Sequence, residues 1–189
     1  MESISKRNTT TLFWVTFFGT ICFLQPVLTL FYLENGLSEA DILLIMLGWS
    51  GAVLVGEIPT GVFADRFGPK QSFLCGSVIK LVSICVLFFA DNIELFMVFS
   101  ILNGLSVTFF SGADEALLYV SLKIDNMQHQ MDEAMGKIQS AGFIAMIIAV
   151  LSGSFIARDL QMEQFHLLIM LSLGCYVLEL LLLFRIREL

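Results

Sequence analysis

The residues best suited to chemistry cluster in one short segment of an otherwise apolar chain. The sixteen residues from Gly56 to Gln71, GEIPTGVFADRFGPKQ, hold a glutamate, two prolines, three glycines and an adjacent Asp-Arg pair. Gly61 and Gly68 permit tight turning and close backbone approach. Asp65 and Arg66 place opposite charges side by side. We interpret the segment as a charged tight turn, and ask which elements position it.

The composition places those elements in a bilayer. The chain has 189 residues, of which 57% are hydrophobic and 14% charged, whereas soluble domains carry roughly 25% charged residues. No basic face exists to neutralise phosphates, so nucleic acid is not an expected partner. The four cysteines lie within apolar stretches and indicate neither a disulfide framework nor a metal site. We expect an all-α membrane protein, bound to no cofactor and no metal, with the lipid bilayer as its surroundings.

Six stretches are long and apolar enough to cross a bilayer, which requires about 20 residues each. They fill residues 1–189 as a single six-helix transmembrane domain. The predicted spans are Thr11 to Leu33, Ile42 to Val62, Ser72 to Ala90, Leu95 to Leu118, Ile138 to Ile156 and Phe165 to Phe184.

The basic residues predict the orientation of these spans. We expect the protein in the cytoplasmic (inner) membrane, with both termini in the cytoplasm. In this orientation eight basic residues lie inside and only Arg158 lies outside, while Lys80 falls within a span. This asymmetry follows the positive-inside rule. The inside residues are Lys6, Arg7, Arg66, Lys70, Lys123, Lys137, Arg185 and Arg187. The Asp-Arg segment then becomes the short cytoplasmic connection between the second and third spans.

In that position the segment resembles the loop signature of the major facilitator superfamily. The pattern Gly-x-x-x-Asp-Arg-x-Gly-x-Lys is met by Gly61, Asp65, Arg66, Gly68 and Lys70. The preceding GEIPTG, and SGADEALLY at the inner end of the fourth span, are similar to the drug-exporter-like bacterial branch. The resemblance covers all six spans and implies the N-terminal six-helix half of a transporter, built from two inverted three-helix repeats.

The resemblance implies a conformational latch. Asp65 would cap a helix of the opposite half, and Arg66 or Lys70 would pair with Asp114 or Glu115 at the inner end of the fourth span. Two departures stand out: Pro69 replaces a basic residue of the pattern, and Ser100 stands where many members have an arginine linked to proton coupling. Proton-driven drug export is therefore not supported. The alternative for the segment is a tight turn with a solvated charge pair.

Further polar residues lie inside the spans, where ionisable groups are functional hypotheses by default. Glu57, one turn before Gly61 and close to the inner surface, is a candidate for the latch or the substrate path. The family places the third and sixth spans away from its cavity, so we predict a structural ion pair between Lys80 and Glu179. The other candidates for the substrate path, with helix-helix hydrogen bonding as the alternative, are Gln25, Asn103 and Ser106.

Small residues recur every four positions on two spans, at Gly48, Ala52, Gly56 and Thr60 and at Ala141, Ala145, Ala149 and Gly153. Such faces allow helices to approach closely. They either pack within the bundle or meet a second domain.

The sequence thus predicts a non-enzymatic protein that transports an unidentified small molecule by alternating access. We expect it to act as a half-length transporter that needs a second half, either a copy of itself or another chain. The alternatives are a truncated or non-transporting remnant, a regulatory membrane protein, or the vitamin-capture subunit of an energy-coupling-factor transporter. A phosphatidyltransferase is excluded, because the closing aspartate of its metal-binding motif would fall on Pro69.

Overall fold

The computed structural model describes residues 4–186, which form helices and turns and contain no strand. Arg187, one of the basic residues used to predict orientation, lies outside this range. Every predicted span has a counterpart long and apolar enough to cross a bilayer, which confirms the expected fold class. The six stretches are Ile4–Glu34, Glu39–Phe67, Pro69–Phe88, Ile93–Ile124, Gln128–Ile156 and Met162–Leu183.

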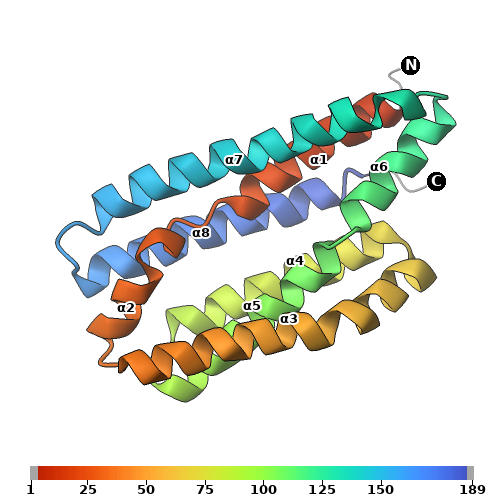
Figure 1. The fold of residues 1–189 in the computed structure, drawn as a ribbon. Helices are drawn as coiled ribbons and strands as arrows, with labels where there is room; N and C mark the ends of the chain where they lie inside the picture. Colours follow the sequence, from red (N-terminus) through yellow and green to blue (C-terminus); the bar gives the residue numbers. More distant parts are fainter. Residues whose placement is uncertain (1–3, 187–189) are drawn as a thin grey trace.

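The helices form two groups, shown in Figure 1. One group contains α1 (Ile4–Thr20), α7 (Met131–Ile156) and α8 (Met162–Leu183). The other contains α3 (Glu39–Phe67), α4 (Pro69–Phe88) and α5 (Ile93–Phe110). Contacts between α4 and α8 join the two groups. The two ends of the described chain lie at the same end of the molecule, as an even number of crossings requires.

The first span is not the continuous helix that we predicted over Thr11 to Leu33. Helix α1 ends at Thr20, residues 21–24 are not helical, and a 3₁₀ turn, η1 (Gln25–Val27), leads into α2 (Leu28–Glu34). Pro26 lies within this turn. Its ring and missing N–H oppose a continuous α-helix.

The fourth span is interrupted as well. Helix α5 ends at Phe110, and α6 (Ala113–Ile124) begins after Ser111 and Gly112. Gly112 has φ +74°, a conformation that glycine adopts without the steric cost of a side chain. The span also continues beyond the predicted end at Leu118. A short 3₁₀ turn, η2 (Gln128–Gln130), then connects it to α7.

The turn between α3 and α4 is a single residue, Gly68, with φ +88°. Pro69 starts the next helix at its first position, where the missing N–H costs nothing. Asp65 and Arg66 therefore belong to the last turn of α3. The turning role predicted for Gly61 is wrong: it lies within α3, and a Cβ added there would have no atom within 4 Å.

Both small-residue faces are used within this domain rather than against a second one. On α3, a Cβ at Gly56 would meet Leu105 and Thr108 of α5 at 3.0 Å, and Thr60 Oγ1 donates to the Thr108 carbonyl at 3.1 Å. On α7, Gly153 lies directly against the Phe23 carbonyl. The prediction of close helix approach is confirmed, and the partners are α5 and the first span.

The buried side chains form two hydrophobic clusters. The first surrounds Phe31, whose ring centroid lies 5.9 Å from that of Phe96 and 5.3 Å from that of Phe165. The second includes Leu12, Phe73 and other side chains from α1, α4, α6, α7 and α8. Residues of both clusters line one cavity.

Candidate functional site

A cavity of about 320 Å³ is lined by α1, α4, α5 and α8 together with the residues at the two interruptions. Its volume falls at the lower end of the range for small-molecule sites. The wall is apolar for the most part, with side chains such as Leu12 and Phe99. Its polar or charged side chains include Gln25, Lys80, Asn103, Ser106, Asp114 and Glu179.

A second cavity of about 570 Å³ adjoins the first, between α3, α5 and the interruption of the first span. Gln25 and Asn103 line both cavities. Asn103 Oδ1 accepts a hydrogen bond from Trp49 Nε1 at 3.1 Å, which holds the amide between the two spaces. Three of the four residues predicted for the substrate path, Gln25, Asn103 and Ser106, therefore line a cavity.

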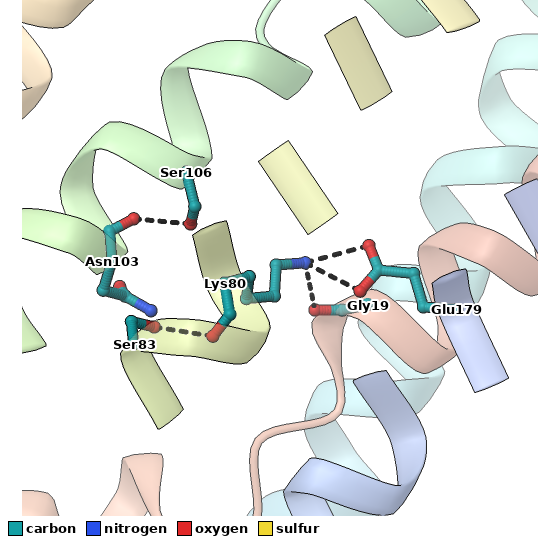
Figure 2. A network of polar contacts seen from close by, with 6 residues as sticks. All are labelled: Gly19, Lys80, Ser83, Asn103, Ser106 and Glu179. Atoms are coloured by element: carbon teal, nitrogen blue, oxygen red, sulfur yellow. Dashed lines mark hydrogen bonds and ion pairs between the residues drawn. The ribbon is translucent and has the colours of Figure 1, made fainter. Parts of the chain in front are cut away.

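Lys80 and Glu179 form the ion pair drawn in Figure 2. Lys80 Nζ lies 2.9 Å from Glu179 Oε1 and 3.0 Å from Oε2. The Glu179 side chain is 1% exposed and that of Lys80 11%. We expected the helices that carry Lys80 and Glu179 to lie away from the cavity. Both charged side chains are instead part of its wall.

The ammonium of Lys80 also caps the C-terminal end of α1, where the first span is interrupted. It donates to the Gly19 carbonyl at 3.3 Å, one of the last-turn carbonyls that have no partner within the helix. The C-terminal end of a helix carries partial negative charge, which favours a cation. The ring of Phe110 lies 4.4 Å from Nζ and that of Tyr176 5.1 Å away, within the range of cation–π attraction.

Gly19 is a site residue that our sequence analysis missed. A Cβ at this position would lie 2.5 Å from Glu179 Oε1 and 2.8 Å from Glu179 Cδ. Only a glycine lets the carboxylate approach α1 this closely. The available signal was a glycine followed by Thr20 in an aromatic, apolar span.

Asp114 lies at the start of α6, directly after the second interruption. It lines the cavity, and its Oδ1 accepts a hydrogen bond from the Glu115 backbone N–H at 2.9 Å. Carboxylates are stabilised at helix N-termini by the partial positive charge there. Together with the Lys80–Glu179 pair, Asp114 gives the cavity wall a formal charge of −1.

The latch residues are not brought together as predicted. Neither Arg66 nor Lys70 forms an ion pair with Asp114 or Glu115. Arg66 Cζ lies 5.5 Å from the centroid of the Phe67 ring, and Lys70 Nζ donates to the Ile186 carbonyl at 2.7 Å. The reason is local: α3 runs on to Phe67, which keeps Arg66 on its last turn, while the kink at Gly112 brings Asp114 to the cavity.

Glu57 differs from the other ionisable residues within the spans. It is exposed on α3, lines neither cavity, and has no ion-pair partner among residues 4–186. It lies ten positions before Phe67, or about 15 Å along the helix axis. Its position close to the inner surface stays a prediction.

Comparison with known proteins gives a coherent result. A sequence model of the Major Facilitator Superfamily matches residues 9–188. An uncharacterised transporter of the same type from Methanocaldococcus jannaschii is 28% identical over 99 residues, which are 51% of this chain and 26% of the relative. The aligned region is therefore about a quarter of the length of that relative.

Proposed function

The chain belongs to the major facilitator superfamily, and from this premise we propose that it moves a small molecule across the cytoplasmic membrane by alternating access. Both termini would lie in the cytoplasm, as the distribution of basic residues favours. Membership of a family of transporters, and similarity to a transporter-type relative, support membrane transport in general. The mechanism and the path are inferred from this chain's own geometry.

The observation that carries the proposal is the pair of interrupted spans beside one cavity. The first and fourth spans hold corresponding places in the two three-helix repeats, and both break next to the cavity. Interrupted helices at corresponding positions of two repeats are the usual construction of a transporter binding site, because half-helix ends and freed backbone groups face the substrate. We assign the substrate path to Gln25, Asn103, Ser106 and Asp114.

A second six-helix half would complete the transporter, and Glu57 supports this part of the proposal. A carboxylate facing hydrocarbon is costly, so intramembrane acids face protein or water. The side chains around Glu57 are exposed too: Leu54 is 76% and Ile58 78% exposed. We infer that this face of α3 meets the second half or an aqueous space between halves, and that Glu57 belongs to the substrate path there.

The latch would act at the inner end of the same helix. Asp65 lies in the last turn of α3, where it can reach a helix start of the second half, while Gly68 sets the turn before Lys70. The open side of Gly61 leaves room for that half to approach. Pairing of Arg66 or Lys70 with Asp114 or Glu115 would then belong to a different state of the cycle from the one described here.

Cys22 offers a test that requires no knowledge of the substrate. It is half-buried and lines both cavities. In a chain with Cys75, Cys85 and Cys175 replaced by alanine, a membrane-impermeant maleimide should label Cys22 from either side of oriented vesicles. Asp65→Asn should change the ratio of the two labelling rates several-fold, because the latch favours one state.

A single-cysteine chain that keeps Cys85 is the matched control, since Cys85 lines an apolar surface pocket. Its labelling should be slow from both sides and insensitive to Asp65→Asn. Labelling of Cys22 from one side only, unchanged by Asp65→Asn, would exclude alternating access. That result would favour a non-transporting remnant or a regulatory membrane protein.

A further inference from the structure

Another pocket, which shares no lining residue with the two cavities of the proposed transport path, lies where the start of α1 meets the end of α8. Its volume is about 530 Å³. The wall is formed by Arg7, Thr10, Thr11, Trp14, Leu182 and Arg185. The positive-inside orientation places this pocket at the cytoplasmic surface of the membrane.

Two arginines, Arg7 and Arg185, line this pocket. Arg7 Nη2 donates to the backbone carbonyl of Arg185 at 3.3 Å, so the two residues lie next to each other. Neither forms an ion pair with an acidic residue within 4–186. Asp125, the acid that meets the start of α1, accepts from the Ser5 backbone N–H at 2.7 Å instead. Two positive charges lining one pocket favour a bound anion.

The wall of the pocket becomes apolar toward the membrane interior. Trp14 is 44% exposed, and its ring centroid lies 5.6 Å from that of Phe17 and 6.0 Å from that of Phe18. On α8, Leu178 and Leu181 are 45% and 58% exposed. Tryptophan is enriched at the level of lipid headgroups, where one side of the ring is apolar and the other is wet. The site is thus cationic at its cytoplasmic end and apolar toward the membrane interior.

We propose that this pocket binds the phosphate of an anionic phospholipid headgroup. The planar guanidinium of arginine matches phosphate oxygens with paired N–H donors. The hydroxyls of Thr10 and Thr11 add neutral hydrogen-bonding groups, and the acyl chains would run along Trp14 and the exposed leucines of α8. Anionic lipids are concentrated in the cytoplasmic leaflet. The inference depends on the orientation of the chain and not on transport.

Native mass spectrometry of the detergent-purified protein tests this assignment. Phosphatidylglycerol and phosphatidylcholine with identical acyl chains are titrated separately, and the first bound lipid is quantified. Phosphatidylglycerol should bind more tightly, and Arg7→Gln and Arg185→Gln should each weaken it about fivefold, the effect of roughly one interfacial cationic side chain. Lys137→Gln, at an exposed position on the same predicted side, is the control and should change binding little.

A third titration uses inorganic phosphate alone. If phosphate at millimolar concentration displaces phosphatidylglycerol and binds with the same arginine dependence, the site is one for a soluble anion and the lipid assignment is overturned. Equal losses in Lys137→Gln and the arginine variants, or no preference for phosphatidylglycerol, would show general charge attraction and overturn it too.

A fluorescence measurement keeps the test independent of charge substitutions. In Trp49→Phe protein, Trp14 is the remaining tryptophan. Brominated phosphatidylglycerol should quench its emission at a several-fold lower mole fraction than brominated phosphatidylcholine. Identical quenching curves for the two lipids would contradict a headgroup site beside Trp14.

Discussion

Two sets of charged residues on the spans differ in their surroundings. Lys80 and Glu179 meet inside the bundle at 2.9 Å, and Lys80 also binds the Gly19 carbonyl and faces two aromatic rings. Glu57 and Asp65, both on α3, have no such partners among residues 4–186. The first set is complete within this domain. The carboxylates of the second set would find partners only if a second six-helix half or another protein contacts α3.

The two sets differ in how the free-energy cost of placing a charge in an apolar region is offset. A buried charge is tolerated when an opposite charge and hydrogen bonds replace the lost water, as they do around Lys80. An exposed carboxylate in an apolar helix has no such compensation from its own chain. We therefore expect substitutions in the first set to change folding stability, and substitutions in the second to change assembly and function.

The largest effect should follow from removing one member of the buried pair. Glu179→Gln leaves Lys80 charged and unpaired, so the free energy of unfolding should fall by about 3–5 kcal/mol, and Lys80→Met should also be strongly destabilising. Replacing both residues, as Lys80→Met with Glu179→Leu, should cost clearly less than either single change. Equilibrium unfolding in mixed micelles measures all three.

The exposed pair Arg158–Asp159, with a 3.4 Å separation, provides the control. Arg158→Gln should change the free energy of unfolding by less than about 1 kcal/mol, because solvent screens exposed pairs. A loss in Glu179→Gln no greater than that of Arg158→Gln would erase the distinction between the two sets of charges.

A smaller loss is expected for Gly19→Ala. The added Cβ would occupy the space of the Glu179 carboxylate, so the pair must shift, at a cost of about 1–3 kcal/mol for overpacking. Gly174→Ala on α8 is the matched control, because a Cβ there has no atom within 4 Å. In the chain that lacks both Lys80 and Glu179, the cost of Gly19→Ala should shrink. An undiminished cost would show that Gly19 acts on α1 alone.

Residue types alone predicted the parts of this molecule that depend on one helix at a time. Six spans follow from hydrophobic length, and close packing follows from the small-residue spacing on α3 and α7. The interruption of the first span was missed because hydrophobic residues continue on both sides of Pro26. That of the fourth span was missed although Gly112 and the polar residues beside it mark the position. The role of Gly19 depends on a carboxylate 160 residues later in the chain, and the cavity depends on four helices at once. Such many-body features have no local sequence pattern.

The second set of charges yields the smallest effect on stability and the sharpest test of a second half. Glu57→Gln removes an exposed charge with no partner in residues 4–186, so the free energy of unfolding of this domain should stay within about 0.5 kcal/mol of the original value. If α3 meets a second six-helix half, the same change should alter assembly, and native mass spectrometry in lipid nanodiscs would show a changed proportion of dimer or of a copurified membrane protein. Glu94→Gln, which removes an acidic charge from the first turn of α5, serves as the control. If both variants and the original protein are monomers, the carboxylate of Glu57 faces water or lipid in a lone six-helix domain. Exposed charges without partners would then be no evidence for a second half.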